Sequence, residues 1–279
     1  MAQEAYASGI NLDALMVNTK AATVYTAQEN SLYLSGGIIP MINVPTGSMK
    51  AQVPVMGAVT AQKLTSEAGT GVDLEARLPS DTKNEITLDL HAARSVLRDI
   101  GGVDPKELGR ILGNSVAKSV DHTVTAAMSG LTEQEITSGN LDLDEVFAAV
   151  ATIRGNGETG ELWGIISTDA YAHLMTAVGN AAFAGGDFQT SAMRNGFFGK
   201  LAGVNCFISS YLNNTVLGGA INPKMVVVSS DAMRLATQGG VNLEVERRAA
   251  AVGFDVVASA AFGAGVIDAN RGVIIIDQA

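Results

Sequence analysis

The sequence predicts an α+β protein with a mixed sheet in its second half. Three observations predict this class. A long stretch between residues 104 and 130 carries an apolar residue at every fourth position, which is typical of a helix. Segments that alternate apolar and polar residues come before it, as strands do. After it, strand-like and short helix-like segments follow one another along the chain.

The first segment, residues 1–46, carries scattered apolar side chains but no sustained helical stripe. These side chains are Tyr25, Leu32, Leu34, Ile38, Ile39 and Ile42. Disordered tails are poor in Ile, Leu and Tyr, so a fully disordered segment is not expected here. We therefore expect an extended arm that lies on another protein surface.

Two strands and a polar stretch follow between residues 46 and 90. The first strand is irregular and holds Met49, Gln52, Val53, Val55 and Val59. The second strand alternates Ile86, Leu88 and Leu90 with Thr87 and Asp89. Residues 60–83 between them are polar and contain Gly. Compact domains rarely hold structureless loops longer than about 15 residues, so we expect this loop to make most of its contacts with other subunits.

The helix at residues 104–130 has the strongest local signals in the chain. Asp104 is a good N-cap, Pro105 suits the first helical position, and Glu107 completes a capping box. The apolar positions, with Ile111 and Ala127 filling in the same face, are Leu108, Leu112, Val116, Val120, Val124 and Met128. Gly130 is placed to end the helix. A single apolar stripe indicates that the helix lies across something broad.

The rest of the chain is predicted to alternate helices and strands. A helix is expected at residues 142–154, with Asp142 and Asp144 at its N-terminal end, where the helix dipole favours acidic side chains. The other expected elements are strands at 162–167, 204–209, 224–228, 241–245, 252–258 and 273–276, a helix at 169–178 and a short helix from Asp231.

Composition and charge exclude some classes of function. Charged residues make up 16% of the chain, against about 25% in ordinary soluble domains. Either much of the surface faces other protein, or the chain is an Ala- and Gly-rich globule. The net charge of −10, without a basic run, argues against tight nucleic-acid binding, which needs Lys and Arg to neutralise phosphates. Cys206 is the only cysteine, so no disulfide can form within the chain.

Neither of two candidate stretches has the pattern of a targeting or membrane segment. Residues 1–19 contain no Lys or Arg and no apolar core, so they do not resemble a signal peptide. Residues 249–267 are nearly long enough and apolar enough to cross a bilayer. Asp255 interrupts them, however, and the alternation of Val252, Phe254 and Val256 with polar or small residues predicts a strand of a sheet.

One motif suggests a nucleotide site. Residues 155–160 read Gly-Asn-Gly-Glu-Thr-Gly, which matches the dinucleotide-binding fingerprint. In that fingerprint a strand comes before the glycines and a helix follows, so that the pyrophosphate sits at the start of the helix. Here the predicted order is reversed. We therefore expect a Gly-rich turn between a helix and a strand.

No other pattern predicts chemistry. His91, His122 and His173 lie far apart, without the spacing of a zinc motif. Cys206 is expected to be a small core residue of a strand, and Trp163 is expected to contact Tyr171 in the core. We expect the chain to be a self-assembling structural subunit and not an enzyme, with no catalytic, cofactor-binding or metal-binding residue and no cofactor.

Several short segments, taken in order, carry a resemblance to a known family. They are residues 86–88 (Ile-Thr-Leu), 93–99 (Ala-Arg-Ser-Val-Leu-Arg-Asp), the helix with 117–121 (Ala-Lys-Ser-Val-Asp) and 129–130 (Ser-Gly), 195–204 (Asn-Gly-Phe-Phe-Gly-Lys-Leu-Ala-Gly-Val), and a late strand from 247–249 (Arg-Arg-Ala) to 262–266 (Phe-Gly-Ala-Gly-Val). This order resembles the tailed-bacteriophage major capsid proteins of the Hong Kong 97-type fold, over roughly residues 30–279. Two features depart from the family pattern: Gly203-Val204 lacks a Pro that is often found there, and Asp255 lies in a run rich in Ala.

The resemblance implies a division of the chain into named parts. These are an N-terminal arm at 1–46, an extended loop at 47–92, a peripheral domain at 93–140 and 238–264 with the spine helix at 104–130, and an axial domain at 141–237 and 265–279.

The resemblance also implies a function and partners. The chain would be a major capsid protein that self-assembles, as hexamers and pentamers, into the icosahedral shell enclosing phage double-stranded DNA. It would act with a separate scaffolding protein, a portal and an optional cement protein, and would hold DNA nearby without sequence-specific binding. It would be assembled in the bacterial host cytoplasm, reside in the virion and contact no membrane. Two alternatives stay open: the shell of an encapsulin-like compartment, and a nucleotide-binding α/β enzyme that uses residues 155–160.

A last expectation concerns the N-terminus. Some relatives in that family carry a long, charged, helical scaffolding segment ahead of the arm and later cut it away. The arm-like pattern here begins within the first few dozen residues, so we expect the subunit to keep its own N-terminus. An arm with so few core-forming side chains can offset the entropy cost of its ordering only by packing on neighbouring surface. We therefore expect that deleting residues 1–30 leaves a soluble, folded subunit that assembles poorly.

Overall fold

A computed structural model describes residues 12–35, 37–56, 81–98, 105–137, 140–180, 200–212, 222–248 and 253–277. Helices and strands are mixed along the chain, which confirms the α+β class. The helices are α1 (Leu12–Asn30), α2 (Leu32–Ser35), α3 (Pro105–Ala127), α4 (Leu143–Gly155) and α5 (Thr168–Asn180). The strands are β1 (Met41–Asn43), β2 (Lys50–Met56), β3 (Asp81–Thr87), β4 (Asp89–Arg98), β5 (Glu133–Thr137), β6 (Leu162–Ser167), β7 (Lys200–Leu201), β8 (Val204–Ser209), β9 (Asn222–Ser229), β10 (Met233–Arg248), β11 (Gly253–Val266) and β12 (Gly272–Asp277).

Helix α3 confirms the predicted long helix. It runs for 23 residues, about 35 Å at about 1.5 Å per residue, and ends in a 3-10 turn at Met128–Gly130. All six apolar residues at the every-fourth positions are buried: Leu108, Leu112, Val116, Val120, Val124 and Met128. The prediction that Ile111 belongs to the buried face is wrong, since its side chain is 53% exposed. The cap residue Asp104 lies outside the described residues.

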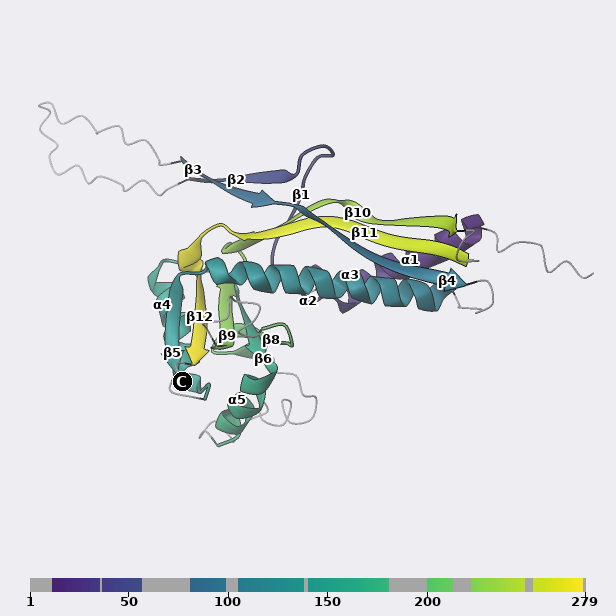
Figure 1. Ribbon diagram of the computed structural model, residues 1–279. Coiled ribbons are helices and arrows are strands. Elements are labelled where there is room, and N and C mark those ends of the chain that lie inside the picture. Colours follow the sequence, from purple (N-terminus) through teal and green to yellow (C-terminus); the bar gives the residue numbers. More distant parts are fainter. Residues whose placement is uncertain are drawn as a thin grey trace, which may run out of the picture.

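A four-stranded sheet lies along α3 (Figure 1). Its strand order is β1-β10-β11-β4. β10 and β11 are long antiparallel partners, with a break in register between Gln238 and Asn242. β4 pairs antiparallel with β11, and short β1 pairs parallel with β10. The N-terminal half of α3 packs on one face of this sheet, in a cluster of Leu108, Leu112, Val116, Leu243, Val256 and Ala258.

A six-stranded sheet forms the other half of the molecule. Its order is β5-β12-β9-β6-β8-β7. The pairs β5–β12 and β6–β8 are parallel and the other pairs are antiparallel, which confirms the predicted mixed sheet. Helices α4 and α5 cover one face through Val146, Ala149, Ile153, Ala170 and Leu174. Residues 225–228 of strand β9 are a continuous apolar run, as expected for a central strand buried on both faces.

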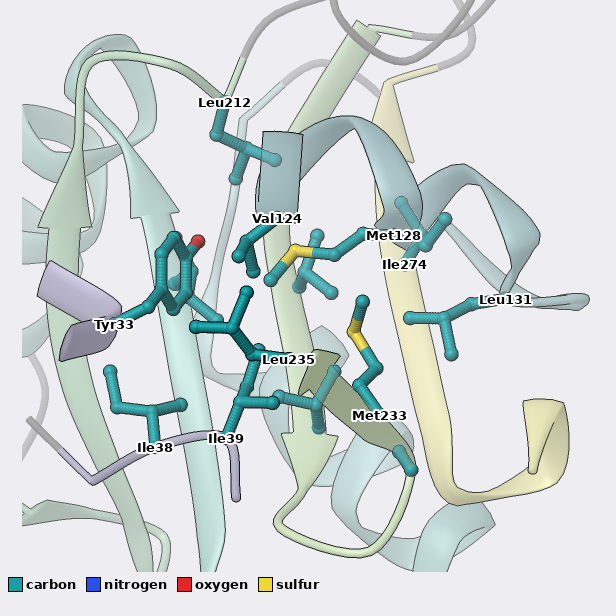
Figure 2. Packing of buried hydrophobic residues seen from close by; sticks show 14 of the residues in the cluster. Tyr33, Ile38, Ile39, Val124, Met128, Leu131, Leu212, Met233, Leu235 and Ile274 are labelled. Atoms are coloured by element: carbon teal, nitrogen blue, oxygen red, sulfur yellow. The ribbon is translucent and has the colours of Figure 1, made fainter. Parts of the chain in front are cut away.

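One apolar cluster joins the two sheets. It contains residues from the segment before β1, the C-terminal end of α3 and both sheets (Figure 2). The labelled members are Tyr33, Ile38, Ile39, Val124, Met128, Leu131, Leu212, Met233, Leu235 and Ile274. Because these side chains share one core, the two sheets and α3 form a single packed body.

The expected extended arm is wrong over residues 12–30 and 32–35, which are helical. Helix α1 packs against α3 of its own chain, so the expectation that the arm packs only on neighbouring surface is also wrong. Gly109 and Gly113 of α3 lie against small residues of α1, namely Thr19, Ala22, Thr23, Thr26 and Ala27. Small residues at this spacing let two helix backbones approach closely, but they leave no apolar stripe in the sequence. Residues 37–40 form no helix or strand, with Gly37 at a positive φ of 60°, and Ile38 and Ile39 are buried there. β1 is an extended strand, as expected for the arm, but it pairs with β10 of its own chain.

Polar contacts hold the end of α1 and the start of α2 on α3. The Ser31 hydroxyl donates to the Asp121 carboxylate (2.7 Å), and the Leu32 backbone N–H donates to its other oxygen (3.2 Å). Asp121 therefore satisfies a free N–H group at the start of α2. Burial of this carboxylate in the helix contact raises its pKa, although the Ser31, Leu32 and Tyr33 hydrogen bonds oppose the shift.

The strand and helix predictions for the second half are mostly confirmed. α4, α5, β6, β8, β9, β11 and β12 fall where they were expected. The short helix from Asp231 is wrong. The chain instead makes one turn, in which the Ala232 N–H donates to the Ser229 carbonyl oxygen (3.1 Å), and then enters the 16-residue strand β10. The Asp231 N–H donates to the Ser229 hydroxyl within the same turn.

Candidate functional site

The glycine turn at residues 155–160 is not arranged as a nucleotide site. It follows α4 and leads into β6, the order that the sequence predicted. Gly157 takes a positive φ of 88°, which a Gly adopts readily. The Glu158 carboxylate accepts the Gly160 N–H at 2.7 Å and forms an ion pair with Arg271 at 2.9 Å. A protein carboxylate thus occupies the place beside the glycine N–H that a phosphate would need.

The three histidines lie on different elements. His91 on β4 bonds through Nδ1 to the Ser119 hydroxyl (2.8 Å) and stacks on Phe262 with ring centres 4.0 Å apart. Burial in this contact lowers its pKa. His122 is exposed on α3 beside Tyr211, and His173 lies on α5. Within the described ranges, no group of three or more His, Cys, Asp and Glu side chains is placed to hold a metal ion.

Cys206 and Trp163 are core residues of the six-stranded sheet. Cys206 is buried, as predicted, and its burial raises the pKa of the thiol to about 12. Trp163 packs beside Phe207, with ring centres 5.8 Å apart, in the cluster that joins the two sheets. Tyr171 packs against the cluster under α4 and α5. Neighbouring residues of a strand point to opposite faces of the sheet, so Trp163 points away from the face that α4 and α5 cover. The expected contact between Trp163 and Tyr171 is therefore wrong.

A projecting hairpin is the feature that the core does not explain. β2 and β3 pair antiparallel from Lys50↔Thr87 to Met56↔Asp81 and form a hairpin. This confirms the first predicted strand over residues 50–56, while Val59 lies outside the described residues. The second predicted strand, residues 86–90, is wrong as one element: it is divided at Leu88 between the end of β3 and the start of β4, and β3 begins at Asp81, inside the predicted 60–83 loop. They form a separate two-stranded sheet (Figure 1). Most of the predicted 60–83 loop, and all of 57–80 between the two strands, lies outside the described residues.

The base of this hairpin is fixed to the body. Ala51, Ile86 and Leu88 are buried with Val44 and Ala236. Hydrogen bonds surround this small core. The side chains of Asn84 and Gln238 donate to backbone carbonyl oxygens of Ile267 and of Pro45 and Ser48. The hairpin therefore leaves the body in a defined direction.

Two glycines of β11 make room for the hairpin to cross the sheet. A Cβ on Gly263 would collide with the backbone of Thr87, and a Cβ on Gly265 would lie 2.9 Å from the Ile86 side chain. The last β4–β11 pair is Asp89↔Phe262. Beyond this pair, Thr87 and Leu88 cross directly over Gly263. β3 therefore leaves the sheet instead of continuing to pair with β11.

The free part of the hairpin exposes polar side chains and open strand edges. Lys50, Gln52, Pro54, Lys83 and Glu85 are exposed, and Lys50 pairs with Glu85. A two-stranded ribbon is only marginally stable in water, because neither face is covered and both edges have unpaired backbone groups. Such a ribbon is stabilised when it lies on another protein surface.

The body also exposes apolar side chains that a monomer would tend to bury. On β4, Leu90 is 68% exposed and Val96 is 44% exposed, on the sheet face opposite α3. On α1, Val17 and Tyr25 point outward. Further exposed members are Met41, Met49, Ile111, Phe147 and Ile208. Single exposed apolar residues are normal, so these positions are candidate contact points only in combination with the projecting hairpin.

The sequence pattern missed the α1–α3 contact and the hairpin base. Only the Gly109-x-x-x-Gly113 spacing, matched by small residues in α1, signalled the first. The base depends on register between distant strands, which has no local signal. No helix in the part of the chain that the structure describes is long and apolar enough to span a membrane.

A long helix along one sheet, a second mixed sheet beyond its end, and an anchored projecting hairpin define an α+β fold. Solved capsid structures have a similar overall fold. The capsid of the native GTA particle matches with a TM-score of 0.70 and 15% identity, over 91% of each chain. The capsid of the cyanophage P-SCSP1u matches with a TM-score of 0.67 and 16% identity, over 86% of each chain.

A third similar structure is the virus-like particle from Pyrococcus furiosus, with a TM-score of 0.64 and 11% identity, over 93% of this chain and 98% of the other. No protein-family model and no curated protein matches the sequence. At these identities the likeness is one of fold. The chain has the fold of the tailed-phage major capsid proteins.

Proposed function

We propose that this chain is a major capsid protein that self-assembles into the icosahedral shell of a phage particle enclosing double-stranded DNA. The observation that carries the proposal is the fold likeness to a capsid subunit over 91% of both chains. The low charged fraction of 16% and the exposed apolar side chains support a subunit surrounded by copies of itself. The role is structural and includes no chemical step.

The proposal extends to the Hong Kong 97-type parts and their partners. The arm would be 1–46, the extended loop 47–92, the peripheral domain 93–140 with 238–264, and the axial domain 141–237 with 265–279. Subunits would form hexamers and pentamers, assembled in the host cytoplasm with a scaffolding protein and a portal, and an optional cement protein on the shell. The net charge of −10 suits a container that holds DNA without binding it tightly.

The hairpin would supply the main contact between subunits. Its base is buried, so a force or contact at its far end is transmitted to β11 and β10. Its strands have open edges that a neighbouring subunit can cover. Residues 57–80, which connect the two strands, would make most of their contacts with other copies of the chain.

A shortened hairpin tests this proposal. Met56 and Asp81 are the last paired residues, so an Asn-Gly turn can replace 57–80 and close the strands. The wild-type chain, purified and viewed by electron microscopy, is expected to form closed shells. The shortened subunit is expected to keep the wild-type unfolding midpoint and to form none.

The matched control keeps the length of residues 57–80 but shuffles their order. This variant tests whether assembly needs only the length of the segment or also its particular side chains. It is expected to assemble poorly, because contacts between subunits depend on specific side chains. Closed shells of normal appearance from the shortened subunit would contradict the proposed role of the hairpin. A wild-type chain that stays monomeric at every concentration and salt tested would contradict the proposed function itself.

A protein compartment without a genome is the second candidate, favoured by the likeness to the virus-like particle. Both candidates predict closed shells, so shell formation does not separate them. Particles isolated from the natural source do. Packaged double-stranded DNA of uniform length supports the capsid, whereas shells filled with a protein cargo and free of DNA support the compartment.

A further inference from the structure

The chain passes between its two sheets three times. The first passage is α3 itself, which leads from β4 to β5. The other two are short: the β9–β10 crossing at residues 230–232 and the β11–β12 crossing at residues 267–271. The two sheets share one core, and these short connections add a second restraint, because few dihedral angles in them determine how one sheet is oriented against the other.

The two short crossings are bonded to each other. The N–H groups of Ile267 and Asp268 both donate to the Ala232 carbonyl oxygen, at 2.8 and 3.2 Å. The crossings therefore lie side by side, and each restricts the path of the other.

Arg271 joins these crossings to a third segment. Its Nη1 lies 2.9 Å from a Glu158 oxygen, on the glycine turn after α4, and 3.5 Å from an Asp231 oxygen, on the β9–β10 crossing. Its Nε donates to Asp268 of its own crossing at 3.0 Å. One guanidinium thus connects three segments that are far apart in the sequence. Its planar, fixed donors make such a link directional in a way that a lysine cannot.

Glu158 makes the link rigid. Only 6% of its side chain is exposed, and its second oxygen accepts the Gly160 N–H at 2.7 Å. Its own carbonyl oxygen accepts a hydrogen bond from the Arg154 guanidinium at 2.9 Å. A buried carboxylate with both oxygens bonded has little freedom to move, so it holds Arg271, and through Arg271 the two crossings, in one position.

We propose that Glu158 and Arg271 are positioning residues for assembly, which fix the angle between the two sheets and thereby the curvature of the shell. The inference rests on the proposed function, because curvature has meaning only for a subunit that forms a shell. Copies whose two halves meet at one fixed angle repeat the same contacts and close into particles of one size. Copies in which this restraint is loosened meet at a wider range of angles and close into particles of several sizes.

The test replaces Arg271 by methionine, which keeps the bulk of the side chain and removes the guanidinium. The matched control is Arg234→Met. Arg234 is also an arginine of this region, but its bonds to Asp231, Ser230 and Met233 all stay within the β9–β10 turn and the start of β10. The measurements are the distribution of particle diameters by electron microscopy and the hydrogen-exchange rates of the Ile267 and Asp268 amides in the unassembled subunit.

Arg271→Met is expected to give shells of several diameters and amide exchange at least tenfold faster at Ile267 and Asp268. Arg234→Met is expected to give one diameter and wild-type exchange. Where Arg271→Met does not fold, because Glu158 is left buried without its partner, the double variant Glu158→Gln with Arg271→Met removes both charges and is used in its place.

Shells of the single wild-type diameter, formed by the Arg271 variant or by the double variant, would overturn the inference while leaving the proposed function intact. Broad diameters in Arg234→Met as well would also overturn it, since the effect would then not depend on the link between the segments. The absence of shells from the wild-type chain would refute the proposed function instead, and the exchange rates would still report whether Arg271 holds the crossings together.

Discussion

Substitution of Gly113 by alanine tests the contact between α1 and α3. A Cβ at this position would lie 2.6 Å from the Thr23 carbonyl oxygen and 2.8 Å from the Thr26 Cβ. Unstrained contacts between such atoms lie near 3.5 Å or beyond. Helix α1 would therefore have to move away from α3 by roughly 1 Å, and would lose packing along the whole contact.

The expected free-energy change is the difference of two effects. Overpacking of a tight contact costs about 1–3 kcal/mol. Alanine favours the helical state over glycine by about 1 kcal/mol, which offsets part of the cost. Gly113→Ala should therefore lower the free energy of unfolding by between about 0 and 2 kcal/mol. Adding Gly109→Ala should cost less than twice as much, because one movement of α1 relieves both collisions.

Hydrogen exchange and urea denaturation together make the assay. The amides of residues 17–30 in α1 should exchange faster in Gly113→Ala, while those in the C-terminal half of α3 should not change. Gly155→Ala is the control: it is also in a helix, but no atom lies within 4 Å of its added Cβ, so stability should stay the same or rise by up to about 1 kcal/mol. If Gly113→Ala shows wild-type amide exchange rates in α1 and a free energy of unfolding raised by about 1 kcal/mol, the close contact between α1 and α3 is refuted.

Two further predictions concern buried titratable groups. Burial raises the pKa of Asp121 above its ordinary value of 3.8, so the folded protein holds this proton more tightly than the unfolded chain. The stability that this gives is present at low pH and is lost as the pH rises through the folded-state pKa. The free energy of unfolding of the wild type, relative to Asp121→Asn, should therefore fall in urea denaturation as the pH rises above the ordinary value of 3.8, and a constant difference would argue against it. Burial also raises the pKa of the Cys206 thiol to about 12. At about pH 8 iodoacetamide should therefore modify only the unfolded protein, and fast labelling of the folded protein would contradict the buried position.

Elements with their own periodic pattern could be predicted from the sequence. In α3 the spacing of apolar residues, from Leu108 to Met128, marks a buried face whatever that face packs against. β9 and β12 are short apolar runs, which predict strands buried on both faces. The one wrong position in α3, Ile111, lies at the edge of the stripe, where the pattern does not distinguish buried from exposed.

Helix α1 could not be predicted in the same way. Its buried face consists of threonine and alanine, and its exposed face carries Val17 and Tyr25, so apolar residues do not gather on one side. The contact depends on Gly109 and Gly113 of another helix, about 90 residues away. In a sequence those glycines indicate only a weak point in a helix. The signal becomes visible only when both helices are considered together.

The sequence indicated the candidate interaction surface only through a polar stretch that has no apolar pattern. The polar stretch at 60–83 suggested contacts outside the domain because it had no apolar pattern of its own. How the hairpin is held, by Ile86 and Leu88 over Gly263 and Gly265, follows from the register of β3, β4 and β11.

A catalytic site and an assembly surface leave different traces in a sequence. A catalytic site needs a few side chains with fixed chemistry, so it appears as a motif. An assembly surface needs a rigid shape repeated in every copy, and the residues that ensure it are those that hold elements in place. For the proposed assembly role they are the glycines under α1 and the hairpin, the buried hairpin base and the link from Glu158 to Arg271. A substitution that leaves each sheet intact but changes the angle or direction of a part should therefore impair assembly more than it impairs folding.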